Sequence, residues 1–337
     1  MDIGISPFID RIGYRPLVVA VHILAVLGFV LFAITPLLSI NPYMGFIVAT
    51  VVFSSGGGLL EVIVSPIVNA LPSKEKSASM SLLHSFYSWG QVSVALITTL
   101  IIFVFGRGAW PYGYLFWALV PFVNIMLLLK CPLVQGVPEK SRIRPVTVLK
   151  NPRFAIFFVL IICAGASELT LGQWTSAFME DAMGLPKIVG DIAGMCMFAV
   201  MMGTARTLNG IKGTEAGLKK LMLAGGTLAF FCYLIVSFTN SPYLGLAACA
   251  LCGLGVSLLW PGTLSIAAKT FPMAGTWLFA ILAAGGDTGA SLGPWLAGVI
   301  GDASGSGLRA SMLAGSIFPL MVVALVIVVW RFESKGS

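Results

Sequence analysis

Charged residues are scarce in this 337-residue sequence. Asp, Glu, Lys and Arg together make up 10% of it, whereas 58% of the residues are hydrophobic; ordinary soluble domains carry about 25% charged residues. This shortage excludes a soluble globular protein, and no polar stretch is long enough to fold as a separate catalytic or nucleic-acid-binding domain. The composition therefore predicts an integral membrane protein whose helices carry the function.

Residues for metal or covalent chemistry are also few. The only histidines are His22 and His84, and neither belongs to a ligand cluster. The six cysteines lie in or beside apolar stretches, where we interpret them as small packing residues. The sequence lacks a His-Glu-x-x-His element and a Walker phosphate loop, and its carboxylates are scattered. We therefore expect no metal, no cofactor and no enzymatic activity.

What the sequence does contain is a series of long apolar runs. A helix needs roughly 20 apolar residues to cross about 30 Å of hydrocarbon, and ten runs meet that length. We place them at 16–38, 43–71, 77–106, 112–130, 154–179, 189–208, 220–238, 242–268, 274–300 and 308–330.

The basic residues predict an orientation for these ten spans. With the segment 10–15 in the cytoplasm, only Arg107, Lys187 and Arg309 of the 20 Lys and Arg residues fall on the outer side, which leaves 17 inside. Cytoplasmic loops of membrane proteins carry such an excess, so we expect a cytoplasmic C-terminus. Because the net charge of +7 is spread over short loops, it indicates topology and not a nucleic-acid partner.

An internal repeat suggests how the spans are grouped. An offset of about 199 residues aligns the run 56–61 (GGGLLE) with 255–260 (GVSLLW), which is typical of transporters built from two six-helix halves. We expect an N-terminal helical bundle over 1–130, a cytoplasmic linker over 131–153 and a C-terminal six-helix bundle over 154–337. On this interpretation the first half lacks one helix and most of another.

Four segments resemble the major facilitator superfamily. They are 10–16 (DRIGYRP), which resembles its loop between helices two and three, and 82–90 (LLHSFYSWG), 168–174 (ELTLGQW) and 285–294 (GGDTGASLGP), which are similar to the fucose permease and related sugar-transporter branch. The resemblance implies an all-α two-bundle membrane fold with ten complete transmembrane helices plus a remnant of helix two. It also implies a bacterial inner (plasma) membrane location and an N-terminally incomplete chain.

Ionisable residues at membrane depth are the first candidates for the site, because they are costly in lipid and usually face a cavity or a partner. Glu61 follows a glycine run and matches an acidic position of helix four in fucose permeases, which makes it the candidate for proton coupling or sugar binding; a structural hydrogen bond is the alternative. Glu168 lies on another predicted helix with Gln173 and Trp174, which offer hydrogen bonds and an aromatic face to a sugar. Trp174 is equally consistent with an interfacial anchor.

A polar stripe and one aspartate complete the candidate set. His84, Tyr87, Ser88 and Gln91 follow i, i+3, i+4, i+7 spacing, and lipid cannot satisfy such a stripe, so it lines either the transport path or a helix interface. Asp287 stands among glycines spaced four apart, which predict tight helix packing; the carboxylate itself projects to another side and is a candidate for the cavity.

The loop residues Asp10, Arg11 and Arg15 are predicted to form a conformational latch, which is the role of this loop in the family that the sequence resembles; solvated surface charge is the alternative. The expected function is secondary active transport of a small polar solute, a sugar or related compound, by alternating access with protons as the candidate coupling ion. The competing predictions are export of a drug or metabolite by the same fold, and a truncated fragment that does not transport. The partners expected are the solute, protons and membrane lipid.

Overall fold

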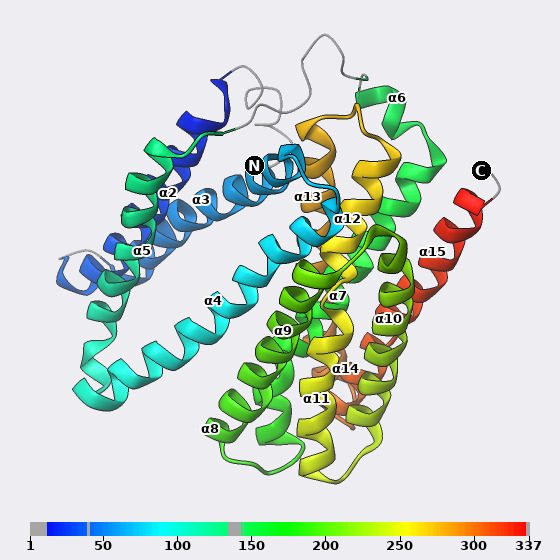
Figure 1. Cartoon of the computed structure of the whole chain (residues 1–337). Helices are drawn as coiled ribbons and strands as arrows, with labels where there is room; N and C mark the ends of the chain where they lie inside the picture. The colour runs from blue at the N-terminus through cyan, green and yellow to red at the C-terminus, as the bar shows by residue number, and fades with distance from the viewer. Residues whose placement is uncertain (1–11, 39–40, 134–142, 144, 335–337) are drawn as a thin grey trace. The chain divides into compact units, whose positions relative to one another are not determined.

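The computed structural model describes residues 12–38, 41–133, 143 and 145–334, and across these ranges it is helical with no strand (Figure 1). Eight helical segments among the described residues are long and apolar enough to cross a membrane. They are Tyr14–Leu37, Pro42–Ala70, Lys76–Phe105, Arg107–Lys130, Pro152–Asp181, Glu215–Phe238, Pro242–Thr270 and Leu308–Phe332. The predicted all-α membrane protein is thereby confirmed.

The two other predicted spans, 189–208 and 274–300, also form helices in the structure. The first is α9 (Met197–Lys212) preceded by a π-helical turn, and the second is α13 (Thr276–Ala303). Neither is among the eight segments, since the first is interrupted and the second carries Asp287 among glycines. The count of ten spans therefore stays a prediction.

Proline and a capping side chain start three of the helices. An Asn or Ser side chain accepts a hydrogen bond from the first turn, and the next residue is a proline whose missing N–H would have had no partner there. This arrangement begins α3 (Pro42–Ala70), α7 (Pro152–Asp181) and α11 (Pro242–Val256). The dipeptides Asn-Pro and Ser-Pro thus mark helix starts directly in the sequence.

The described chain divides into two compact units, and two long helices contribute to both. The first unit lies within Met1–Leu71, Ser93–Ile143 and Met273–Ile281, and the second within Pro72–Val92, Arg144–Pro272 and Leu282–Ser337. As a result, α4 (Lys76–Phe105) supplies its first half to the second unit and its second half to the first. The same holds for α13, whose first residues belong to the first unit.

In the first unit, α2 (Tyr14–Ile34) packs against both α3 and α5 (Trp110–Lys130). Its core is mainly aliphatic and includes Val21, Val62 and Ile63. Gly56 permits this packing, because a Cβ at that position would lie 3.0 Å from the carbonyl oxygen of Val21. Gly56, in the glycine run before Glu61, therefore lets α2 lie close to α3.

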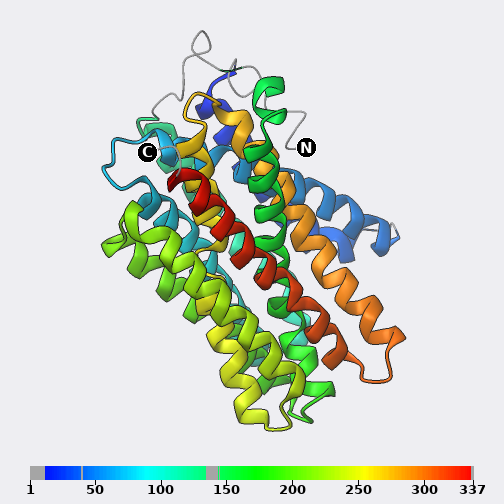
Figure 2. The ribbon, with the colours of Figure 1, turned by 90° about the vertical axis from the view of Figure 1, so that its right-hand side faces the viewer.

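The second unit is built around α7. The most apolar stretch of this helix is 67% buried, the largest share among the eight candidate spans. The elements of this unit are the first half of α4, α6 (Pro145–Leu149), α7, α8 (Lys187–Val189), the π-helical turn Gly190–Cys196, α9, α10 (Glu215–Phe238), α11, α12 (Leu259–Thr270), most of α13, α14 (Leu308–Gly315) and α15 (Ile317–Ser334). Figure 2 shows α15 (red) running along α7 (green), and α13 (orange) also packs against α7.

Glycines allow the backbone of α13 to approach α7 closely. A Cβ at Gly289 would collide with the carbonyl of Ile162, and one at Gly293 would collide with Thr170. Substitution of Gly289 therefore requires backbone movement, and substitution of Gly293 requires at least the Thr170 side chain to move. The predicted tight glycine face around Asp287 is present, and α7 is its partner.

Candidate functional site

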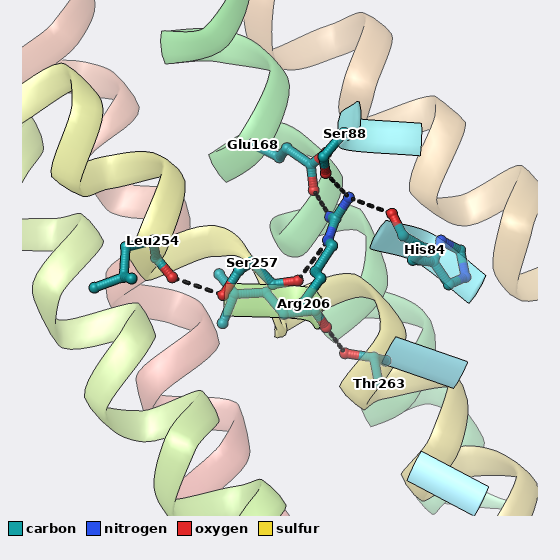
Figure 3. A network of polar contacts seen from close by, with 8 residues as sticks. His84, Ser88, Glu168, Arg206, Leu254, Ser257 and Thr263 are labelled. Carbon is teal, nitrogen blue, oxygen red and sulfur yellow. Dashed lines mark hydrogen bonds and ion pairs between the residues drawn. The ribbon is translucent and has the colours of Figure 1, made fainter. Parts of the chain in front are cut away.

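Arg206, in the middle of α9, is the centre of a buried polar network (Figure 3). The residue is 1% exposed. A guanidinium has five N–H donors and no acceptor, and four donated hydrogen bonds account for most of them. They go to Glu168 Oε2, Ser88 Oγ and the carbonyl oxygens of His84 and Ser257.

The acidic partner of Arg206 is Glu168, on α7. The guanidinium Nη2 lies 2.7 Å from Glu168 Oε2, and the two side chains are 2% and 7% exposed. Each charge would be expensive at this depth on its own, so their pairing explains why both are tolerated. The pair is a fixed dipole inside the helical bundle that the second unit forms.

The carbonyl of Ser257 is available to Arg206 because of a proline. In a regular helix this oxygen would accept a hydrogen bond from the N–H of residue 261, but Pro261 has none. The helix breaks between α11 and α12, and Arg206 Nε donates to the freed oxygen at 2.8 Å. Pro261 thus frees a carbonyl, and Arg206 supplies the donor for it.

The polar stripe of α4 faces α9 within the same unit. Ser88 accepts from Arg206 Nη1 at 3.1 Å, and Ser81 donates to the Arg206 carbonyl oxygen at 2.8 Å. The ring centroid of Tyr87, whose side chain is half exposed, lies 5.9 Å from the Arg206 guanidinium carbon. These contacts tie the first half of α4 to α9.

Two side-chain atoms of the stripe are buried without a hydrogen-bond partner among the described residues. They are His84 Nε2 and Gln91 Oε1. A buried polar atom left unpaired costs roughly 1–3 kcal/mol. A polar ligand that forms a hydrogen bond with either atom would recover this free energy. Both lie on the face of α4 that also carries Ser88.

The other predicted site residues lie on α7, α13 and α3. Trp174 donates its indole N–H to the Pro294 carbonyl oxygen at 2.9 Å, which anchors it to α13, and Gln173 is exposed. Asp287 is half-buried on α13, and Glu61 is half-buried on α3 in the first unit.

Of the three predicted latch residues, the structure describes one. Arg15 donates to the Cys131 carbonyl oxygen at 2.7 Å, which ties the start of α2 to the end of α5. Asp10 and Arg11 lie outside the described residues. No group of three or more His, Cys, Asp or Glu side chains that could hold a metal occurs within the described ranges.

Arg206 itself corrects the sequence analysis, which counts it with the basic residues of cytoplasmic loops. The structure buries it inside α9 and pairs it with Glu168. Without Arg206 the predicted charge asymmetry is 16 to 3 instead of 17 to 3. The signal available in the sequence was one cation and one carboxylate in separate apolar runs.

Comparison with known proteins assigns the family. The family model described as Major Facilitator Superfamily matches residues 3–212, more than half of the chain. The chain belongs to the major facilitator superfamily. Its relatives in this superfamily with solved structures are transporters, which agrees with the expectation that the chain is not an enzyme. No curated protein sequence matches the chain.

Two solved superfamily members illustrate the likeness in fold. The transporter FucP in its outward conformation has a TM-score of 0.79 and 15% identity, over 96% of this chain and 85% of FucP; another structure describes E. coli FucP as a fucose:proton symporter. The human organic anion transporter MFSD10 has a TM-score of 0.75 and 15% identity, over 95% of this chain and 79% of its own. The predicted resemblance to the fucose permease branch is confirmed at the level of fold.

Proposed function

We propose that this superfamily member is a secondary active transporter that moves a small polar solute, a sugar or related compound, by alternating access. The observation that carries the proposal is the buried Arg206–Glu168 pair beside the two unpaired polar atoms of α4. A sugar needs several directed hydrogen bonds in a site largely closed to water. His84 and Gln91 supply one unpaired nitrogen and one unpaired oxygen on the same face of α4.

The network also suits a helix interface that opens and closes during transport. By the grouping expected from the repeat, α4 belongs to the N-terminal bundle (1–130), whereas α7 and α9 belong to the C-terminal bundle (154–337). Rocking of the bundles would break the bonds from Arg206 to α4 and keep its bond to Glu168 within one bundle. We assign to Arg206 the role of holding one conformational state. The linker 131–153 would connect the two bundles on the cytoplasmic side of a bacterial inner membrane.

Glu61 is the proposed site of proton coupling. It is a half-buried carboxylate in a membrane-spanning helix of the first unit, and intramembrane carboxylates commonly act in proton relays. The fold likeness to a fucose:proton symporter supports a proton as the coupling ion. The latch role of Arg15 with Asp10 and Arg11, and solute contacts of Asp287, Gln173 and Trp174, remain predictions of the same kind.

Uptake of labelled L-fucose into proteoliposomes, with and without an imposed inward proton gradient, tests the proposal. We expect gradient-driven accumulation in the parent protein and loss of uptake in Q91L and H84F. The matched control is F86L on the same helix, whose side chain is 71% exposed. E61Q should still exchange labelled fucose for unlabelled fucose across the membrane, but it should no longer accumulate fucose when the proton gradient is imposed. Uptake that does not depend on the proton gradient would contradict proton coupling. A loss of uptake in F86L equal to that in Q91L and H84F would contradict the role of the polar stripe of α4.

A second candidate is export of an amphipathic organic anion. It is supported by the fold likeness to an organic anion transporter, and a cation in the site suits such a solute. The pairing of Arg206 with Glu168 argues against it, because the two charges cancel locally. Competition of labelled fucose uptake by neutral sugars, but not by amphipathic carboxylates, is the outcome expected from the first candidate.

A further inference from the structure

A groove lies on the second unit where α9 and α10 separate. α11 packs against both helices and forms the floor, with Leu254 beside Ser257. The walls are Leu208 from α9 and Leu221 and Ala224 from α10, and the cavity measures about 500 Å³. This volume is in the range of ligand sites, about 300–1,000 Å³. The two wall leucines are 52% and 45% exposed, so the groove opens to the lipid.

One end of this groove is polar, in contrast to the rest of its lining. Asn209 is 8% exposed, and neither its Oδ1 nor its Nδ2 has a hydrogen-bond partner among the described residues. Both polar atoms of this buried amide are therefore unsatisfied. Lys212 lines the same end and is exposed. An apolar channel that ends in an unpaired amide and an ammonium matches a molecule with a hydrocarbon chain and an anionic head.

We propose that this groove binds an anionic phospholipid of the phosphatidylglycerol type. One acyl chain lies between Leu208 and Leu221, and the phosphate is held by Lys212. The headgroup satisfies both atoms of Asn209, since its ester and phosphate oxygens accept from Nδ2 and its glycerol hydroxyls donate to Oδ1. A choline headgroup has no hydroxyl or N–H to donate, so phosphatidylcholine would leave Oδ1 unpaired.

The bound lipid would also touch the interruption between α11 and α12, where Ser257 bonds to Arg206. Ser257 lines the groove and offers its carbonyl oxygen to Arg206 Nε on the other side. Binding is inferred from the groove alone and does not depend on what the protein transports.

Lipid retention in native mass spectrometry tests the inference with detergent-purified protein. We expect the parent protein to retain one phosphatidylglycerol at concentrations at which it loses phosphatidylcholine. One lysine near a membrane surface contributes about a fivefold change in affinity, so K212A should weaken phosphatidylglycerol binding about fivefold. The matched control, K220A, removes an exposed lysine close to Lys212 in sequence that does not line the groove, and binding should be unchanged.

Two more variants separate the binding of the lipid's acyl chain from the binding of its headgroup. A224W fills the groove and should abolish retention of either lipid, and L228F serves the same purpose if A224W does not yield monodisperse protein. N209L should reduce the preference for phosphatidylglycerol over phosphatidylcholine. Equal retention of both lipids by the parent protein, retention of neither, equal effects of K212A and K220A, or full binding in the filled groove would each overturn the inference.

Discussion

Replacing Glu168 by Gln tests whether the buried ion pair contributes to folding. The substitution keeps the shape and one acceptor oxygen, but it leaves the Arg206 guanidinium without a counter-charge at a site where it is 1% exposed. Removing one partner of a buried pair costs about 3–5 kcal/mol. Three neutral acceptors remain on Arg206, namely Ser88 Oγ and the carbonyl oxygens of His84 and Ser257, so we expect about 3 kcal/mol.

The companion variant R206M and the double variant complete a thermodynamic cycle. R206M leaves the Glu168 carboxylate buried without its cation, so it should also be destabilising, by about 3–5 kcal/mol. The double variant buries no charge, and it should cost less than the sum of the two single variants by at least about 2 kcal/mol. The free energies of unfolding come from titration with SDS in mixed micelles, followed by circular dichroism.

A second ion pair in the same unit is the internal control. Lys269 Nζ lies 2.9 Å from Glu215 Oε2, but the lysine side chain is 67% exposed. Exposed pairs contribute about 0–1 kcal/mol, so K269M should cost less than about 1 kcal/mol. Additive single costs within about 0.5 kcal/mol, or a K269M cost equal to that of E168Q, would refute the assignment of the Arg206–Glu168 pair as a coupled, desolvated unit.

Three further substitutions or labels test other features. P261A restores an N–H that competes with Arg206 for the Ser257 carbonyl, so it should slow solute uptake more than it lowers the yield of folded protein; unchanged uptake would contradict the role of the freed oxygen. G289V should prevent folding, judged by size-exclusion chromatography, whereas G57V, which meets open space, should not. Cys131 is exposed and the other five cysteines are buried, so an impermeant maleimide should label Cys131 alone, from the face that bears a C-terminal tag. Labelling from the opposite face would refute the predicted topology.

Much of the fold follows from the sequence because lipid imposes simple rules. The predicted spans 43–71, 112–130 and 220–238 differ from α3, α5 and α10 by a few residues, since apolar runs end where polar loops and Asn-Pro or Ser-Pro caps begin. The glycine face around Asp287 was also predictable, because glycines spaced four residues apart lie on one side of a helix.

The site was only partly predictable, because its partners are far apart in the chain. Glu168 and Ser88 were identified as polar residues at membrane depth, but their meeting point is a cation 38 residues from the first and 118 from the second. A single arginine near the end of an apolar run has the same local pattern as a loop residue. Likewise, Pro261 predicts a free carbonyl, but only the packing of α9 shows which donor uses it.

The serines of α4 have a consequence for sliding motion. Hydroxyls stand at Ser77, Ser81, Ser85 and Ser88, about one helical turn apart, and the one at Ser81 currently pairs with the backbone oxygen of Arg206. If α4 moved by one turn, about 5.4 Å, another hydroxyl would arrive opposite the same oxygen. Positions of α4 one turn apart would therefore offer this oxygen similar hydrogen bonds, whereas the positions between them would not.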